Sequence, residues 1–250
     1  TDTPTNPEIK KVDARNPETP VAGAVFHVWN DEGTFDAEMT TDENGTISLA
    51  YAKHGSYHVQ EVAAPEGYAI TDLDDEGNPT ITDFTVNDQG MIEWDESGAM
   101  AQAHEFTLEN MPKTMKTTAT DSESGTHEGQ AREELTIVDT IAYTGLIPGD
   151  EYTVSGILMD KATGDPALDD AGSEITASTT FTAEESCGTV NVTFTFAGAS
   201  LAGKSLVAFE TMEFEGAEYM VHADIGDVEQ TVAIVDIATQ ARDAETGTNV

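Results

Sequence analysis

Short apolar runs with a two-residue alternation of hydrophobic and polar positions dominate the chain, a pattern typical of half-buried strands. The clearest runs are 22–29, 55–62 and 135–143. Turn residues separate them: Asn44-Gly45 supplies the positive φ of a tight hairpin, and the Pro-bearing segment 15–20 is also predicted as a turn. No long stretch has the 3.6-residue apolar period of an amphipathic helix. The pattern therefore predicts an all-β fold.

The chain is long enough for two domains, each with its own core. We predict a first domain over 1–112, a second over 113–236, and an immunoglobulin-like β-sandwich for each, because short strands and turns alternate regularly. An internal repeat extends this organisation, since 115–125 recurs at 237–247. Thr, Ala, Asp, Glu and Gly occupy the same positions in both copies. Residues 237–250 are therefore predicted to begin the next repeat, and neighbouring repeats of the same chain are expected partners.

The charge balance is extreme, with 48 acidic residues against 10 basic ones and a net charge of −38. Nucleic acid and anionic membranes are not expected as partners, because both require clusters of Lys and Arg. Cys187 is the only cysteine, so no intrachain disulfide can form. The chain begins without Met and contains no signal peptide and no apolar stretch of 18 residues, and we interpret it as a fragment of a longer mature protein.

Three polar side chains of the first domain share the parity of apolar strand positions. Lys11 is in phase with Ile9, Glu61 with Tyr57 and Val59, and Asn110 with Phe106 and Leu108. Burial lowers the pKa of a Lys and raises that of a Glu, so the amine can be neutral and the acid protonated. A neutral Lys11 amine could then attack the Asn110 carboxamide and form an isopeptide bond. The alternative is a buried Lys11–Glu61 ion pair with Asn110 as an ordinary strand-end residue. Lys10 competes as nucleophile but has the opposite parity.

The second domain also has polar side chains at strand positions that share the parity of apolar residues. Asp139 is in phase with Leu135, Ile137 and Ile141, Gln230 with Val232 and Ile234, and Glu210 and His222 end apolar runs. The opening strand presents Thr117 inward and no Lys, so a Lys–Gln bond is not the expected product, and an ester from Thr117 to Gln230 is possible. His222 would act as base, while Asp139 and Glu210 would orient groups and share protons. Thr118 is the rival nucleophile.

The first domain resembles the Cna protein B-type (SpaA-like) domain of Gram-positive adhesins and pilins. The resemblance is carried by 9–13, 23–26, 41–45, 55–57, Glu61-Val-Ala-Ala-Pro-Glu-Gly-Tyr68 and 106–112. It implies an isopeptide bond between Lys11 and Asn110, assisted by Glu61.

The second domain is similar to the VaFE repeat, an ester-bond-forming, immunoglobulin-like stalk domain. The similarity is carried by Thr117-x-Ala-x-Asp, Thr136-Ile-Val-Asp139, 143–149, 152–160, 203–210 and 222–231. It implies Thr117 and Gln230 as bond partners, with Asp139, Glu210 and His222 in supporting roles. The internal repeat favours Thr117 over Thr118, because Thr239 is the counterpart of Thr117 and Gln240 that of Thr118.

Together the resemblances imply an extracellular stalk segment of a cell-wall-anchored adhesin. The cross-linking is single-turnover and self-directed, so the protein is not expected to be an enzyme. A host ligand would be bound by a distal tip domain. The main alternative is that the first domain itself binds a host protein or glycan through Trp29, Tyr51 and Trp94. A hydrolase built on His222 and the nearby acids is a third interpretation.

No cofactor is expected. Asp72, Asp74 and Glu76, together with Asp83, have part of a calcium-loop pattern, but no helical pattern flanks them. A solvated acidic hairpin loop is the favoured interpretation, and a cation site is the alternative.

Overall fold

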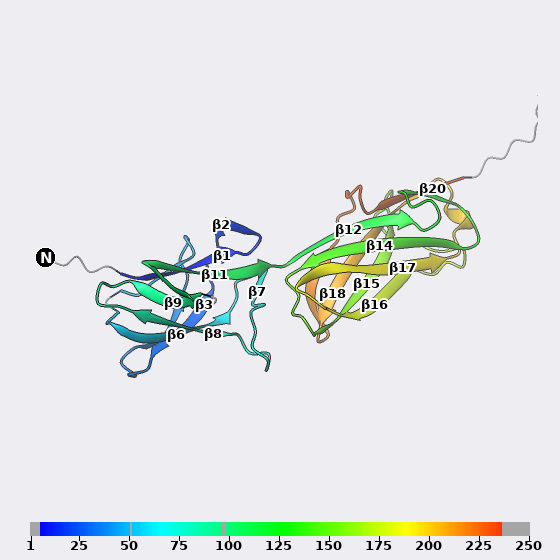
Figure 1. Cartoon of the computed structure of the whole chain (residues 1–250). Coiled ribbons are helices and arrows are strands. Elements are labelled where there is room, and N and C mark those ends of the chain that lie inside the picture. The colour runs from blue at the N-terminus through cyan, green and yellow to red at the C-terminus, as the bar shows by residue number, and fades with distance from the viewer. Residues whose placement is uncertain (1–5, 51, 97–98, 237–250) are drawn as a thin grey trace, which may run out of the picture. The chain divides into compact units, whose positions relative to one another are not determined.

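The computed structural model describes residues 6–50, 52–96 and 99–236, and within these ranges the chain is all-β, as predicted (Figure 1). The chain forms two compact units, one made mostly of residues up to Thr114 and one beginning at Met115. The sole helical element of the described ranges is a 3-10 turn, η1, at Ala199–Leu201. No helix in them is long and apolar enough to span a membrane. The predicted next repeat at 237–250 lies outside the described residues.

The first domain contains two sheets of antiparallel and parallel strands. Its strands are β1 (Glu8–Asp13), β2 (Asn16–Pro20), β3 (Val25–Asn30), β4 (Asp36–Thr40), β5 (Thr46–Ser48), β6 (Gly55–Ala63), β7 (Tyr68–Ala69), β8 (Ile81–Val86), β9 (Ile92–Glu96), β10 (Ala99–Ala103) and β11 (Glu105–Pro112). Among the described residues, one sheet has the order β2-β1-β11-β7, with β5 paired to β1, and the other has the order β10-β9-β8-β6-β3-β4.

The core of the first domain is formed by alternate residues from both sheets. Ile9 and Phe106 come from the first sheet, and Phe26, Tyr57 and Phe84 come from the second. All five are buried, which is the result expected from a period of two with one face packed and the other solvated. The first and last strands, β1 and β11, are parallel neighbours in the same sheet.

The segment predicted as a Pro-bearing turn is instead largely strand β2, so that prediction is wrong. β2 pairs antiparallel with β1 through Val12↔Pro20 and Asp13↔Asn16. It is the edge strand of its sheet. Pro cannot donate to a hydrogen-bond ladder, but an edge strand has one side without a partner strand, so Pro is tolerated there.

The second domain also contains two sheets. Its strands are β12 (Thr114–Asp121), β13 (Glu128–Gln130), β14 (Leu135–Thr144), β15 (Glu151–Asp160), β16 (Thr176–Thr182), β17 (Cys187–Phe196), β18 (Ser205–Phe214), β19 (Ala217–His222) and β20 (Thr231–Val235). Within the described ranges the sheets have the orders β12-β14-β17 and β13-β20-β18-β15-β16, with β19 paired to β18. Ile137, Phe194, Tyr152 and Val232 are among the residues that build the core from both sheets.

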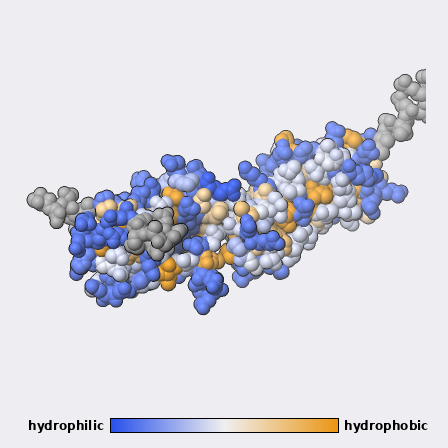
Figure 2. All heavy atoms as spheres, in the orientation of Figure 1, coloured by the Kyte–Doolittle hydropathy of each residue, from blue (hydrophilic) through white to orange (hydrophobic). Residues whose placement is uncertain are grey.

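Hydrophilic residues cover much of the face seen in Figure 2, and this holds for each domain taken separately. This distribution agrees with the net charge of −38. Like charges on a surface keep a protein soluble, but they also oppose its compact state. Both domains therefore need interactions that offset this repulsion.

Candidate cross-linking sites

Lys11, Glu61 and Asn110 lie together in the first domain. β1 carries Lys11 and β11 carries Asn110, and the two parallel strands are in register with Asp13 opposite Asn110. Glu61 comes from β6 of the other sheet. The exposed fractions of these residues are 2% for Lys11, 7% for Glu61 and 1% for Asn110. The alternation of the strands thus directs all three side chains into one apolar interior.

The carboxylate of Glu61 contacts both prospective bond partners. Lys11 Nζ lies 2.8 Å from Glu61 Oε2, and Asn110 Nδ2 donates a hydrogen bond of 3.1 Å to the same oxygen. A second bond of 3.1 Å from Asn110 Nδ2 to the Ala69 carbonyl fixes the orientation of the amide. Lys11 Nζ also donates to the Glu109 carbonyl at 2.7 Å. The amide nitrogen that would leave as ammonia therefore faces the acid.

Burial sets the protonation states in this cluster. It lowers the pKa of the Lys11 amine, against the opposing attraction of Glu61, and it raises the pKa of the Glu61 carboxyl. Both shifts favour the neutral amine and the neutral acid over the ion pair. A cavity of about 50 Å³ borders Lys11, Glu61 and Leu108, which is room for a molecule of the size of water or ammonia.

Lys10, the competing nucleophile, occupies a different environment. Its side chain is 37% exposed, and its amine lies 3.7 Å from Glu105. The burial that lowers the pKa of the Lys11 amine is therefore missing at Lys10. Among the two lysines of β1, Lys11 alone has the burial that the chemistry requires.

The second domain brings Thr117, Asp139, Glu210 and Gln230 into its interior. β12 supplies Thr117 and β14 supplies Asp139, whereas Glu210 lies on β18 and Gln230 directly precedes β20. Their exposed fractions are 5% for Thr117, 1% for Glu210 and 0% for Asp139 and Gln230. The rival Thr118 is exposed. The two prospective ester partners therefore belong to opposite sheets.

Main-chain hydrogen bonds hold the Gln230 segment between β12 and β18. Ala119 N–H donates to the Glu229 carbonyl at 2.9 Å, and Ala208 N–H donates to the Gln230 carbonyl at 3.1 Å. The side chain of Gln230 donates through Nε2 to Glu210 Oε2 at 2.6 Å. Within the described part of the chain, Thr117 Oγ1 and Gln230 Oε1 have no hydrogen-bond partner. Unpaired polar atoms in a core are costly, and a reaction between these two groups would remove the hydroxyl.

Two buried acids share the site with Gln230. Burial, reinforced by the nearby Asp139 carboxyl, raises the pKa of Glu210 to about 10. Burial likewise raises the pKa of Asp139. Glu210 therefore keeps its proton at neutral pH.

His222 lies at the margin of this site, in register with Glu210 across β18 and β19. Its Nε2 is 3.0 Å from Asp227 Oδ2, and its side chain is 22% exposed. Asp227 was not assigned a role from the sequence. The sequence feature that could have pointed to Asp227 is its position five residues after His222, but many pairs of exposed residues have that spacing. The Ala69 carbonyl in the first domain was also missed, because sequence does not reveal main-chain partners.

The remaining candidates from the sequence do not form comparable clusters. Asp74 accepts hydrogen bonds from the N–H groups of Glu76 and Asn78, and Asp72 accepts one from Thr80. The described residues include no group of three or more His, Cys, Asp or Glu side chains that could hold a metal ion.

The aromatic residues proposed for ligand binding are also dispersed. Trp94 packs against Phe106 of the core, with ring centroids 5.1 Å apart. Trp29 lies between His27 and His58, with centroid distances of 4.4 and 5.2 Å. Tyr51 lies outside the described residues. No observation in the described chain specifically favours the ligand-binding alternative.

The folds and buried groups define two β-sandwich domains, each with a buried amine or hydroxyl on its first strand and a buried carboxamide near its last. Comparison with known families agrees with this description. Residues 113–234 match the T-Q ester bond containing domain, and residues 5–97 match the SpaA prealbumin-like fold domain. The chain is therefore a SpaA prealbumin-like domain followed by a T-Q ester bond domain, as the two resemblances implied. A search among curated proteins finds no match.

Solved structures with similar folds are pilins and adhesins of Gram-positive bacteria. A Mobiluncus mulieris adhesin containing intramolecular disulfide, isopeptide and ester bond cross-links has 17% identity and a TM-score of 0.40, covering 49% of this chain and 57% of that one. This chain thus spans little more than half of that adhesin. A variant of BcpA, the major pilin subunit of Bacillus cereus, has 15% identity and a TM-score of 0.43, covering 97% and 73%. The major pilin SpaD from Corynebacterium diphtheriae has 12% identity and a TM-score of 0.39, covering 85% and 61%.

Proposed function

We propose that each domain forms one intramolecular cross-link, a Lys11–Asn110 isopeptide bond in the first and a Thr117–Gln230 ester in the second. The observation that carries the proposal is common to both domains. A buried nucleophile on the first strand lies in the same interior as a carboxamide near the last strand, and that carboxamide donates a hydrogen bond to a buried acid of raised pKa.

In the first domain the neutral Lys11 amine attacks the Asn110 side-chain carbonyl carbon. Protonated Glu61 donates its proton to Asn110 Nδ2, which lies 3.1 Å from its carboxyl oxygen, and then takes up a proton from the attacking nitrogen. Ammonia leaves and the isopeptide bond remains, so no proton is gained or lost overall. Positioned proton transfer of this kind typically accelerates a reaction by about 10²–10⁴-fold.

In the second domain the Thr117 hydroxyl attacks the Gln230 side-chain carbonyl carbon. His222 accepts the hydroxyl proton, and protonated Glu210 donates its own proton to the leaving nitrogen at the Nε2 contact of 2.6 Å. Asp139 shares the Glu210 proton and helps to return the proton held by His222. Ammonia leaves, the ester remains, and the dry interior protects it from hydrolysis.

The consequence of the two bonds is a stalk segment that resists force and proteolysis. Each bond joins the beginning of a domain to its end, so tension applied at the termini is carried by a covalent link. Closing a loop of roughly 100 residues stabilises a domain by up to about 4–5 kcal/mol in the chain-entropy treatment used for disulfides. This offsets the repulsion from the net charge of −38 without a cysteine pair.

A bacterial cell surface is the proposed location, as part of a wall-anchored adhesin or pilus-like protein. The family matches and the pilin and adhesin neighbours support this location. Neighbouring repeats of the same chain would be the immediate partners, and a distal tip domain would bind any host ligand. Each site reacts once on its own chain, so the activity is not that of an enzyme.

The intact mass of the purified chain tests the proposal. The wild type should fall short of its sequence mass by two ammonia molecules, while Lys11→Ala and Thr117→Ala should each restore one. Glu61→Gln should also prevent the isopeptide bond and leave the ester unchanged. Lys10→Ala and Thr118→Ala are matched controls that should keep both losses. A wild-type mass equal to the sequence sum would refute the cross-links.

A further inference from the structure

The turn that follows β12 is organised by one buried carboxylate. Asp121 is 1% exposed and ends β12, four residues after Thr117. Its Oδ1 accepts hydrogen bonds from the N–H groups of Glu123 and Ser124, at 3.2 and 2.8 Å. Its main-chain carbonyl accepts from Gly125 N–H at 2.9 Å. Asp121 therefore fixes the path by which the chain leaves the strand that carries Thr117.

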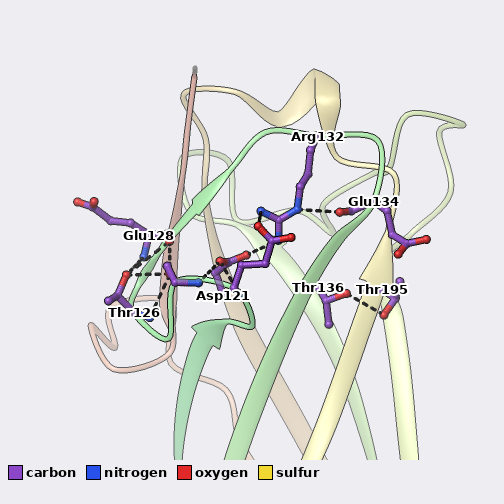
Figure 3. A network of polar contacts seen from close by, with 9 residues as sticks. Asp121, Thr126, Glu128, Arg132, Glu134, Thr136 and Thr195 are labelled. Carbon is purple, nitrogen blue, oxygen red and sulfur yellow. Dashed lines mark hydrogen bonds and ion pairs between the residues drawn. The ribbon is translucent and has the colours of Figure 1, made fainter. Parts of the chain in front are cut away.

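Arg132 completes this network from the other side of the turn (Figure 3). Its Nη2 donates to Asp121 Oδ2 at 2.9 Å, its Nε donates to the Glu134 carbonyl at 2.8 Å, and its Nη1 lies 3.1 Å from Glu123. The guanidinium thus ties the end of β12 to the segment that leads into β14. A planar group with several simultaneous partners fixes geometry better than a single flexible contact.

The segment between Asp121 and Arg132 also contacts the strand that follows Gln230. β13 pairs parallel with β20, with Gly129 opposite Ile234. Gly129 packs so closely on Asp121 that an added Cβ would lie 3.2–3.4 Å from its side chain. One continuous unit therefore connects the strand of Thr117, through Asp121 and β13, to the strand of Gln230.

We propose that Asp121 and Arg132 are positioning residues for the Thr117–Gln230 ester, an inference that rests on the proposed function. Neither residue contacts the reacting groups; both act by fixing the register between β12 and β20. The ester joins opposite sheets, and β12 has its sheet partner in β14 rather than in β20. The Ala119–Glu229 main-chain hydrogen bond fixes the Thr117 and Gln230 segments at one point, and the Asp121–Arg132 network, acting through β13, is a second connection between them.

The sequence of the next copy keeps the spacing on which this role depends. Asp243 and Gly247 stand four and eight residues after Thr239, as Asp121 and Gly125 stand after Thr117. A misplacement of about 1 Å can cost a positioned reaction about 100-fold. Loss of the pair should therefore act on the rate of ester formation far more than on the fold.

The rate of ester formation tests the inference. The full chain is synthesised in a cell-free reaction, samples are stopped with acid at intervals, and the loss of ammonia is followed by intact mass in a Lys11→Ala background, which leaves the ester as the only expected cross-link. Arg132→Ala should slow the loss by roughly 10- to 100-fold, and Arg132→Lys should recover part of the rate. Asp121→Asn, which keeps an oxygen acceptor for the turn, should also slow it.

Lys204→Ala is the matched control, because Lys204 forms an ion pair of 2.7 Å with Asp160, another buried aspartate of the same domain. It should leave the rate within about twofold of the parent chain, since this pair is not on the Asp121 turn. The same substitutions in a Gln230→Ala background, followed by thermal unfolding, report their effect on stability without an ester.

The outcomes are separable. No loss of ammonia in the parent chain would refute the ester itself. A parent that reacts, with Arg132→Ala and Asp121→Asn reacting equally fast, would overturn only the positioning role. Equal slowing by Arg132→Ala and Lys204→Ala would also overturn it, because a general loss of stability would then explain the effect.

Discussion

In the proposed reactions, burial gives the reacting residues their chemistry. Lys11 and Thr117 are ordinary side chains in water, where an ammonium ion and a hydroxyl are weak nucleophiles at neutral pH. In the interior of a β-sandwich the amine loses its charge more readily, and carboxyls such as Glu61 and Glu210 hold a proton more readily. The same burial that destabilises the unreacted domain therefore prepares it for reaction.

The raised pKa of Glu210 predicts how an ester-free domain responds to pH. In a Thr117→Ala chain, folded Glu210 keeps its proton up to about pH 10, whereas the unfolded chain releases it near pH 4.3. The stability from this group is therefore fully present below about pH 4.3 and is lost as pH rises toward 10, by up to about 1.4 kcal/mol per pH unit.

Replacing this acid by an amide should remove that dependence. In urea unfolding, Thr117→Ala/Glu210→Gln should have a smaller slope of unfolding free energy with pH than Thr117→Ala, and should be more stable at pH values above about 7. Equal slopes in the two chains would contradict the assignment of the proton to Glu210.

His58 provides a second pH dependence, in the first domain. Its two ring nitrogens lie 2.8 Å from Asp31 and 2.7 Å from Asp83. The hydrogen bond to Asp31, followed by that to Asp83, raises the pKa of the imidazole above its ordinary value of about 6.5. The contribution of protonated His58 to the free energy of unfolding is therefore fully present below about pH 6.5, and it is lost as pH rises through the raised pKa of the imidazole.

Thermal unfolding of a Lys11→Ala chain between about pH 6 and pH 9 tests this point. The parent should lose stability across this range by an amount that His58→Gln removes. The exposed His54 offers a control, and His54→Gln should keep the parent's response. A parent and a His58→Gln chain with the same pH profile would be inconsistent with the bridged imidazole.

At the scale of elements, the position of β1 depends on the turn at Gly45. Gly45 has a φ of 72°, and its carbonyl accepts a hydrogen bond of 2.7 Å from Lys11 N–H. An added Cβ would lie 2.4 Å from the Lys11 carbonyl oxygen. Gly33 has a similar φ of 64°, but no atom lies within 4 Å of its Cβ position.

Substituting Ala at each of the two glycines therefore separates the cost of a strained positive φ from the cost of a steric clash with Lys11. Gly33→Ala should cost about 1 kcal/mol of unfolding free energy in a Lys11→Ala chain, and Gly45→Ala should cost about 2–4 kcal/mol. Denaturant unfolding of the two variants measures the difference. Similar costs for both would mean that the turn does not fix β1.

Much of this arrangement could be predicted from alternation along the strands. Lys11, Asn110, Thr117 and Gln230 are all buried, as their parity with apolar neighbours predicted. Parity indicates which face of a strand a side chain lies on, but it does not indicate which strands are adjacent in the sheet. The edge strand β2 was missed because two prolines favour a turn when the sheet order is unknown.

The supporting contacts could not be predicted in the same way. The Ala69 carbonyl holds the Asn110 amide through main-chain geometry, and Asp227 contacts His222 through the shape of a loop. Asp121 was recognised only as a position of the internal repeat and of the family motif Thr117-x-Ala-x-Asp121. These contacts depend on how strands pack, which the local pattern does not encode.

At the scale of the whole chain, the two proposed bonds leave few residues outside a closed loop. Tension along the chain would enter each domain at its first strand and leave near its last. Single-molecule pulling should therefore extend the wild-type chain without an unfolding step from either domain. Thr117→Ala should gain one step with a contour length of roughly 38 nm, because about 110 residues are released at about 3.5 Å each.

Lys11→Ala should add the corresponding step for the first domain, while Lys10→Ala should behave as the wild type. Wild-type unfolding steps of full domain length would contradict the mechanical role even if ammonia is lost. Missing steps in the variants would contradict it as well, because they would show that the bonds do not limit extension.

Peptide mapping can locate both proposed bonds in one sample. The purified chain is digested, and the peptides are sequenced by tandem mass spectrometry. We predict that the peptide containing Lys11 is joined to the one containing Asn110, and that those containing Thr117 and Gln230 are joined, each pair lacking one ammonia. Recovery of all four residues in linear, unmodified peptides would contradict the account.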